Sequence, residues 1–280
     1  MIGNLGFKCC LAVFGLLCMA EYHSFASVND DGYRHLTDVS YVLENETDQY
    51  RIDRCKLDIY YPENVDKFAT LVWFHGGGLE GGSKALRDEF RNRGFAVVDV
   101  NYRLFPKAKC PAYIDDAALA VAWVFNHIEE YGGTPDQIYI GGHSAGGYLT
   151  LMVALAKNYL SQYGVDADRI VKAYPVSGQT TTHYAIRAER GISRDLPVID
   201  SLAPSNNVRK EGAPIMMITG DRELEMMARY EENAHLYALL RHFGHQTQLY
   251  ELQGCDHVSV LGPACYIIRE DIMRQRKAGL

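Results

Sequence analysis

The stretch from Ile138 to Tyr148 constrains the fold of this chain more than any other. It has the pattern of a buried strand, a tight turn and the start of a helix, and the apolar helical pattern continues to Leu160. The turn, Gly142-His143-Ser144-Ala145-Gly146, fits Gly-x-Ser-x-Gly, in which the serine lies at the apex of a sharp strand-to-helix bend. This turn is called the elbow below. Glycines are needed because a Cβ two residues before or after the serine would collide with neighbouring backbone. We therefore expect Ser144 at a helix N-terminus, where free N–H groups favour developing negative charge.

The composition is that of an ordinary globular protein. The chain has 280 residues, of which 48% are hydrophobic and 22% charged, enough for one large α/β domain with a substantial core. The net charge of −7 and the lack of a basic stripe argue against nucleic acid as a partner. We expect one catalytic domain over residues 27–280.

The first 26 residues predict a signal peptide. Lys8 is the only charge before the apolar run Cys9 to Ala20, and Ser24-Phe25-Ala26 offers small residues for cleavage after Ala26. An apolar run of about 12 residues is too short to span a bilayer comfortably, although an uncleaved N-terminal anchor is the alternative. The sequence thus predicts a periplasmic or secreted protein without stable membrane insertion.

Four cysteines remain after removal of the predicted leader, namely Cys55, Cys110, Cys255 and Cys265. An even number in an exported protein permits two disulfides with three possible pairings, and buried free thiols are an equal alternative. The cysteine spacings do not suit a zinc site. We expect no metal and no organic cofactor.

Strands alternate with helices along most of the chain. This alternation predicts an α/β fold, with a mostly parallel central sheet of about eight strands flanked by helices. A loose segment is expected over Val28–Asp38 and two antiparallel strands between Ser40 and Tyr61. The strands expected after these are Ala69–His75, Phe95–Val100, the strand before the elbow, Arg169–Tyr174, Ile215–Thr219 and Gln246–Leu252, and the helices are Ser83–Arg93, Ile114–Tyr131, Tyr148–Leu160, Met226–Phe243 and Gly262–Lys277. Active sites in such sheets lie at the carboxyl ends of the strands.

One irregular segment, residues 177–213, interrupts the alternation. A loop this long in a compact domain is usually functional or mobile. We interpret it as a small lid over the site, with His183 placed to touch substrate, and the alternative is a decorative excursion.

A serine hydroxyl needs a base to become a good nucleophile, and that base is typically a histidine oriented by a carboxylate. The chain has ten histidines, so position must select one. His257 follows the last expected strand in the turn Gly254-Cys255-Asp256-His257, at the carboxyl edge of the sheet beside the elbow. His242 and His245 precede that strand, on the opposite side of the domain. His257 is therefore the candidate base.

The orienting carboxylate should follow the preceding strand. Asp221 comes directly after the strand that ends at Thr219 and is our candidate. Glu223 and Glu225 are close rivals, because a small misreading of the strand end would change the choice. The resulting order Ser144, Asp221, His257 is the one expected of a serine-elbow hydrolase.

A glycine-rich segment, His75-Gly76-Gly77-Gly78, follows the strand Ala69–His75. Glycines at a strand end let backbone N–H groups point at a reacting carbonyl oxygen. We predict an oxyanion hole formed by Gly77 and Gly78 together with the Ala145 N–H. A phosphate-binding loop is disfavoured, because neither Gly-Lys-Ser/Thr nor Gly-x-Gly-x-x-Gly opens a helix here.

Taken together, these motifs resemble those of the α/β-hydrolase superfamily, and within it the esterases and lipases that carry a His-Gly-Gly-Gly loop. The similarity covers about residues 36–275. The residues that match the motifs are His75–Gly78, Asn101–Leu104, Gly142–Gly147, Asp221 and His257. The resemblance implies that Tyr102 and Arg103 brace the oxyanion loop and that Asp115 or Asp116 has a structural role. The N-terminus reads as strands, unlike the helical cap of the hormone-sensitive-lipase branch, which implies a more open pocket.

The overall pattern is similar to that of exported bacterial esterases that release acyl groups from plant polysaccharides. We therefore expect hydrolysis of short-chain, acetyl-type esters, on small molecules or on carbohydrate, through an acyl-serine intermediate. Two alternatives stay open. One is a serine peptidase of the same fold, and the other is a non-catalytic hydrolase-fold binding module.

Overall fold

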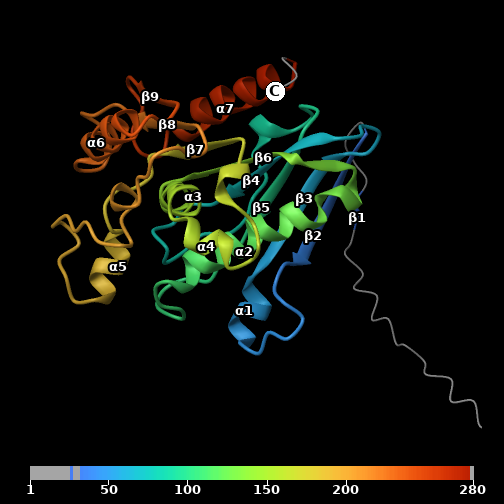
Figure 1. Cartoon of the computed structure of the whole chain (residues 1–280), viewed down its shortest axis with the longest axis horizontal. Coiled ribbons are helices and arrows are strands. Elements are labelled where there is room, and N and C mark those ends of the chain that lie inside the picture. The colour runs from blue at the N-terminus through green and yellow to red at the C-terminus, as the bar shows by residue number, and fades with distance from the viewer. Residues whose placement is uncertain (1–25, 28–31, 278–280) are drawn as a thin grey trace, which may run out of the picture.

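A nine-stranded sheet forms the centre of the molecule (Figure 1). The computed structural model describes residues 26–27 and 32–277, so the predicted signal peptide, apart from Ala26, lies outside the described residues. The strand order is β1-β2-β3-β5-β4-β6-β7-β8-β9. Their bounds are β1 Ala26–Ser27, β2 Tyr33–Ser40, β3 Lys56–Pro62, β4 Phe68–Phe74, β5 Ala96–Val100, β6 Gly133–His143, β7 Lys172–Val176, β8 Ile215–Gly220 and β9 Thr247–Leu252.

The pairing along this sheet confirms the predicted mostly parallel arrangement. β1, β2, β3 and β5 pair antiparallel, whereas every pairing among β5, β4, β6, β7, β8 and β9 is parallel. Parallel strands of this kind are covered on both faces, which explains why their apolar runs are continuous rather than alternating. Every residue of β4 is buried.

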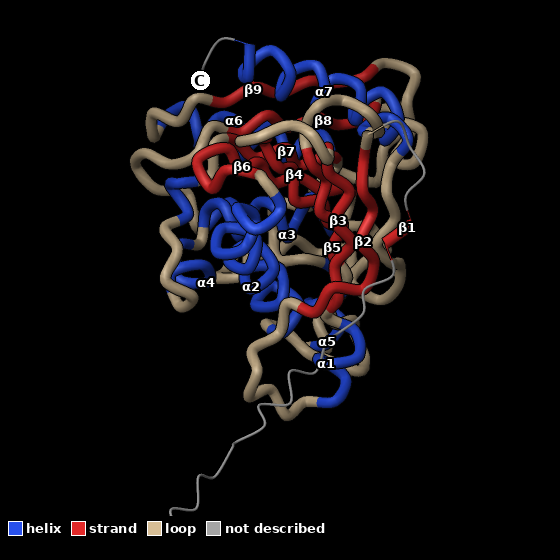
Figure 2. Tube along the Cα trace, turned by 90° about the vertical axis from the view of Figure 1, so that its right-hand side faces the viewer, coloured by secondary structure: helices blue, strands red, loops and turns tan. Residues whose placement is uncertain are grey.

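Helices cover both faces of the sheet (Figure 2). One core contains side chains of α2, α3 and α6, and the other contains side chains of α7. The helices are α1 Gln49–Arg54, α2 Ala112–His127, α3 Ala145–Leu155, α4 Lys157–Ser161, α5 Tyr184–Glu189, α6 Arg229–His242 and α7 Leu261–Lys277. This is the α/β-hydrolase fold, and its strand ends carry the candidate site described below.

Three expected elements differ from the structure. Of the two strands expected between Ser40 and Tyr61, only β3 forms, and the segment before it contains the helix α1. The helix expected over Ser83–Arg93 is wrong, since only the single 3-10 turn Asp88–Phe90 forms there. Tertiary contacts take the place of helical hydrogen bonds in this segment. The Lys84 N–H donates to the Asn101 side chain (2.7 Å), and the buried Phe90 ring packs edge-on against Trp73. The segment expected to be loose is also partly wrong, because its residues from Tyr33 onward pair with β3 as strand β2.

The four cysteines of the described part of the chain are free thiols, of which Cys55 and Cys265 are buried. Of the two alternatives that the sequence left open, this structure therefore has the free thiols and not the two disulfides. None of the helices in residues 26–27 and 32–277 has the length and apolar character of a transmembrane span.

Candidate active site

The elbow between β6 and α3 has the backbone that its sequence predicts. Ser144 has φ 56° and ψ −114°, a conformation that non-glycine residues rarely adopt. A Cβ at Gly142 would lie 2.5 Å from the carbonyl carbon of Gly146, and one at Gly146 would lie 2.0 Å from the Phe74 oxygen. Only glycine fits at these two positions, and the bend leaves Ser144 at the first turn of α3.

His257 contacts the serine hydroxyl. It lies in the turn after β9, and its Nε2 is 2.9 Å from Ser144 Oγ. His143 supports this turn, since its Nε2–H donates to the backbone oxygen of His257 (2.7 Å). Burial, together with the nearby His257, lowers the pKa of His143 to about 4, so the ring is neutral at neutral pH. The predicted pair Ser144 and His257 is thus brought together, with His143 as a support that the motif did not specify.

The carboxylate that contacts His257 is Glu225, and the choice of Asp221 was wrong. A hydrogen bond joins His257 Nδ1 to Glu225 Oε1. The chain turns directly after β8, with the Glu225 N–H donating to the Asp221 oxygen (2.8 Å), and this turn brings Glu225 back to the sheet edge. The Asp221 carboxylate instead accepts the N–H groups of Glu223 (3.0 Å) and Gly254 (2.9 Å), so it ties together the turns that follow β8 and β9.

Glu225 is held as a buried anion. Its side chain is 0% exposed and accepts hydrogen bonds from Ser177 Oγ (2.6 Å) and from the N–H groups of Gly220 and Met226 (each 3.1 Å). Burial by itself raises the pKa of this carboxyl, but the hydrogen bonds from His257 and Ser177 outweigh burial and lower the pKa to about 2. The carboxylate is therefore ionised wherever His257 can act as a base.

The glycine loop after β4 lies against the elbow. A Cβ at Gly76 would be 3.4 Å from the Cβ of Ser144, and Gly77 and Gly78 have φ of 115° and 67°. Within the described part of the chain, no atom accepts a hydrogen bond from the N–H groups of Gly77, Gly78 or Ala145. These are the three donors that the sequence predicted for an oxyanion hole, and they remain available to a ligand.

A layer of side chains supports this loop from behind. The Tyr102 hydroxyl donates to the His75 oxygen (2.7 Å), and the two rings stack with centroids 4.3 Å apart. Arg54 donates to the oxygens of Gly82 (2.6 Å) and Tyr102 (3.1 Å). Tyr102 thus braces the loop as the resemblance implied, and Arg54 is a second brace that the sequence did not reveal.

Arg103, the second brace that the resemblance implied, bonds Asp116 and Asp48 and has no hydrogen bond to the loop within the described part of the chain. Its guanidinium holds the buried Asp116 carboxylate through two hydrogen bonds of 2.8 Å. Arg51 forms ion pairs with Asp115 (2.8 Å) and Asp116 (2.9 Å). Both aspartates are therefore structural, which agrees with the role implied for them.

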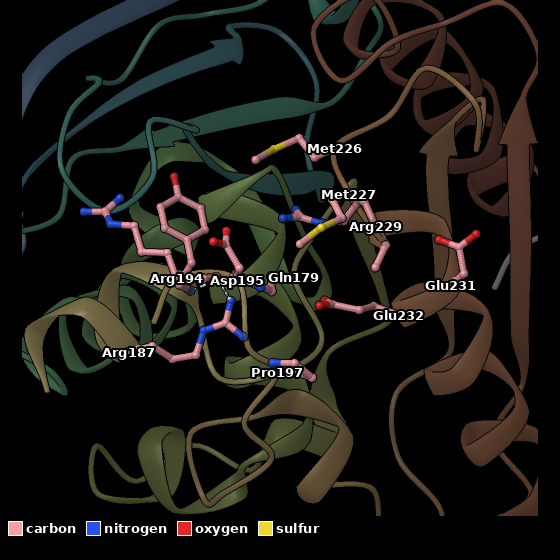
Figure 3. A pocket seen from close by; sticks show the side chains of 12 residues that line it. Gln179, Arg187, Arg194, Asp195, Pro197, Met226, Met227, Arg229, Glu231 and Glu232 are labelled. Carbon is pink, nitrogen blue, oxygen red and sulfur yellow. Dashed lines mark hydrogen bonds between the residues drawn. The ribbon is translucent and has the colours of Figure 1, made fainter. Parts of the chain in front are cut away.

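The 177–213 insertion contributes α5 and lies beside the oxyanion loop. A Cβ at Gly78 would be 2.2 Å from the Tyr184 hydroxyl. His183, expected to touch substrate, is instead 1% exposed, and its Nδ1 caps α5 by accepting the Ala185 N–H (3.2 Å). A cavity of about 550 Å³ separates the insertion from the start of α6 (Figure 3).

The profile of the BD-FAE family matches residues 57–237, which is most of the described chain and includes Ser144 and Glu225. The chain belongs to the BD-FAE family. The matched region runs from β3 into α6, and His257 lies beyond it.

Several relatives of this chain carry esterase names. Over 134 residues the chain is 36% identical to the probable carboxylic ester hydrolase LipM of Mycobacterium tuberculosis, covering 45% of this chain and 30% of LipM. Over 103 residues it is 38% identical to carboxylesterase NlhH of the same organism, covering 34% of this chain and 32% of NlhH. The matched segments therefore span about a third of these relatives' length.

Solved structures extend the similarity of fold over nearly the whole chain. A truncated carbohydrate esterase from gut microbiota superposes with a TM-score of 0.72 at 19% identity, covering 88% of this chain and 98% of that one. Butyrate-bound esterase 2 of Thermogutta terrifontis superposes with a TM-score of 0.68 at 19% identity, covering 85% and 93%. At these identities the likeness establishes the fold.

Proposed function

We propose that this chain is a serine carboxylic ester hydrolase that acts on short-chain, acetyl-type esters. The observation that carries the proposal is the continuous path of hydrogen bonds from Ser144 through His257 to Glu225, beside three unused N–H donors. The esterase names of the relatives and of the similar structures support the same reaction class.

The geometry supports an acyl-transfer mechanism. Because ionised Glu225 accepts the Nδ1–H of His257, the Nε2 lone pair is free to take the proton of Ser144 Oγ. Ser144 then attacks the ester carbonyl, and the oxyanion is held by the N–H groups of Gly77, Gly78 and Ala145. The alcohol leaves with the proton from His257, and an acyl-Ser144 ester forms.

Water completes the cycle. His257 takes a proton from water, the resulting hydroxide attacks the acyl-Ser144 carbonyl, and the acid is released with the proton returned to Ser144. Removing one oxyanion donor from a site of this kind costs about 3 kcal/mol in the transition state. Each donor is thus expected to matter for kcat.

The proposed substrates include acetyl groups carried by plant polysaccharides as well as small esters. A similar structure is named a carbohydrate esterase, and the cavity beside the site has a mixed polar and apolar lining. The cavity's polar side chains can serve sugar hydroxyls, which need both donors and acceptors.

The decisive test is hydrolysis of 4-nitrophenyl acetate and acetylated xylan by the wild type, Ser144→Ala and Ser193→Ala. Ser193 is an exposed serine of the insertion and serves as the control. We expect activity in the wild type and control, and loss in Ser144→Ala with the fold retained. Undiminished activity of Ser144→Ala would refute the proposal.

A fluorophosphonate probe should label Ser144, and an aminoacyl amide assayed alongside tests the peptidase alternative.

We also propose export to the periplasm or medium, on the basis of the leader pattern in residues 1–26. Fractionation of expressing cells and N-terminal sequencing of the mature protein test this. A protein that keeps its first 26 residues and stays in the cytoplasm would contradict it.

A further inference from the structure

The cavity of about 550 Å³ lies beside the proposed catalytic residues. Two of its lining residues connect it to them: Met226 follows Glu225 directly, and Tyr184 places its hydroxyl against Gly78. The insertion forms one wall and the start of α6 the other, as Figure 3 shows. An ester bound at Ser144 can therefore extend a substituent into this space.

Two buried arginines line the cavity, Arg187 from α5 and Arg229 from α6. Each is 3% exposed. Arg187 donates to the backbone oxygens of Leu196 (2.7 Å) and Arg194 (2.5 Å), and Arg229 donates to the Ser177 oxygen. Among the described residues, neither guanidinium has an ion-pair partner, and the Nε of each has no acceptor.

The carboxylates of the cavity wall are committed elsewhere or face solvent. Glu232 accepts from the Thr180 N–H and the Thr181 hydroxyl, both at 3.1 Å. Asp195 and Glu231 are exposed. The third arginine, Arg194, is paired with Glu80 at 2.5 Å. Arg187 and Arg229 are thus the two cations that the wall leaves without a contacting anion.

Two buried guanidinium groups without a contacting anion are costly. Desolvation of a buried charge is repaid only by a partner of opposite charge in good geometry. Burial lowers the pKa of both arginines, and the charge of Arg187 lowers the pKa of Arg229 further. The charge of Glu232 acts against burial at both arginines, as does Asp195 at Arg187 and Glu225 at Arg229, although none of these carboxylates is in ion-pair contact with them. A guanidinium presents its donors in a planar fork that matches a carboxylate. The two guanidinium groups of the cavity wall are therefore suited to bind an anionic oxygen group of a ligand.

We infer that this cavity is a subsite for a carboxylate carried by the ester substrate, recognised by Arg187 and Arg229. The inference rests on the proposed esterase function and specifies its substrate class. The carboxylate can belong to the acyl part, as in a monoester of a dicarboxylic acid, or to the alcohol part, as in an acetylated hydroxy acid. Both sources present the same group to the two arginines.

Paired substrates distinguish the two sources. Mono-4-nitrophenyl succinate is compared with 4-nitrophenyl butyrate for the acyl side, and 4-acetoxybenzoate with its methyl ester for the alcohol side. The measured quantity is the ratio of kcat/KM for the charged ester to that for its neutral partner. The wild type should favour the charged ester in at least one pair.

The variants are Arg187→Met and Arg229→Met, with Arg190→Met and Arg241→Met as exposed controls on or next to the same two helices. Each cavity variant should lower the favoured ratio roughly 10- to 100-fold, the loss expected for a hydrogen bond to a charged group. The controls should change it less than about twofold. General damage to the fold lowers both rates and leaves the ratio unchanged.

Arg187→Lys and Arg229→Lys serve where a methionine variant fails to fold, and they should lower the ratio about tenfold because the planar fork is lost. A drop in the succinate pair assigns the carboxylate to the acyl side, and a drop in the acetoxybenzoate pair to the alcohol side. Preference for the neutral ester in both pairs, or ratios unchanged in the arginine variants, would overturn the subsite. A wild type that hydrolyses none of the four esters would instead refute the esterase function.

Discussion

The Ser177 hydroxyl donates a 2.6 Å hydrogen bond to Oε2 of Glu225, while Oε1 of the same carboxylate contacts Nδ1 of His257. Ser177 follows β7 directly and has φ 46°, and its N–H donates to the Ile218 oxygen of β8 (2.7 Å). The serine is thus fixed by the sheet and in turn fixes the carboxylate that orients the candidate base. Ser177 is a positioning residue, since it acts through Glu225.

Removing this hydroxyl in Ser177→Ala should lower kcat about tenfold, because a charge-assisted hydrogen bond to Glu225 is lost. The pKa of Glu225 should rise, because Ser177 is one of the groups that lower it. A carboxylate that has lost one hydrogen-bond donor attracts a proton on His257 more strongly, so the acid limb of the pH profile of kcat/KM should move to higher pH. Ser205→Ala is the control, since that buried hydroxyl bonds the Thr180 oxygen (2.8 Å). A Ser177 variant with an unshifted acid limb would show that the contact is only structural.

Glu225 and Asp221 make opposite predictions when each is neutralised. Glu225→Gln should reduce kcat by roughly 10³- to 10⁴-fold, the scale seen when the orienting carboxylate of a serine triad becomes an amide. Asp221→Asn should change kcat only a few-fold, because Asp221 holds two turns together and does not contact His257. Steady-state kinetics with 4-nitrophenyl acetate tests both. The reverse ranking would return the orienting role to Asp221.

The parts of the site that the sequence predicts follow from local rules. The glycines at positions 142 and 146 are dictated by backbone collisions, and the turn after the last strand must carry its residues to the carboxyl edge of the sheet. Ser144 and His257 could therefore be placed from strand ends alone. The oxyanion loop is predictable for the same reason, since Gly76 to Gly78 follow the central strand β4.

The choice among Asp221, Glu223 and Glu225 depends on the path of one turn, which sequence patterns do not specify. The turn is closed by the hydrogen bond from the Glu225 N–H to the backbone oxygen of Asp221. From that position the glutamate side chain, which is longer than that of aspartate, reaches His257. Arg187 and Arg229 belong to two helices separated by the rest of the insertion and by β8, so only the folded chain shows that they line one cavity. The same limit explains the missing helix at residues 83–93, where contacts with Asn101 and Trp73 override local propensity.

The lowered pKa of Glu225 predicts a specific loss of stability in acid. Its pKa is about 2 in the folded chain against an ordinary value of 4.5, so the contribution to folding is complete above about pH 4.5 and is lost as pH falls toward 2. At about 1.4 kcal/mol per pH unit, that contribution is at most roughly 3 kcal/mol, of which about 2 disappears between pH 6 and pH 3.

Urea unfolding at pH 6 and pH 3 measures this contribution. The wild type and the control Glu223→Gln, which alters an exposed side chain, should lose about 2 kcal/mol more between the two pH values than Glu225→Gln does. Equal losses in all three proteins would mean that the Glu225 carboxylate is not stabilised by its hydrogen bonds in the folded state.

The elbow glycine Gly146 makes the sharpest prediction about folding. A Cβ there would lie 2.0 Å from the Phe74 oxygen and 2.8 Å from the His75 oxygen, both backbone atoms that cannot move without shifting β4 and the oxyanion loop. Gly146→Ala should therefore destabilise the protein by several kcal/mol or prevent folding.

Gly262→Ala in α7 is the matched control, because its nearest neighbour would be the Glu89 carboxylate at 3.4 Å, an ordinary contact. That control should be neutral or up to about 1 kcal/mol more stable, since alanine favours a helix over glycine. Thermal unfolding of the two variants measures the difference, and equal melting temperatures would contradict the close approach of the elbow to β4.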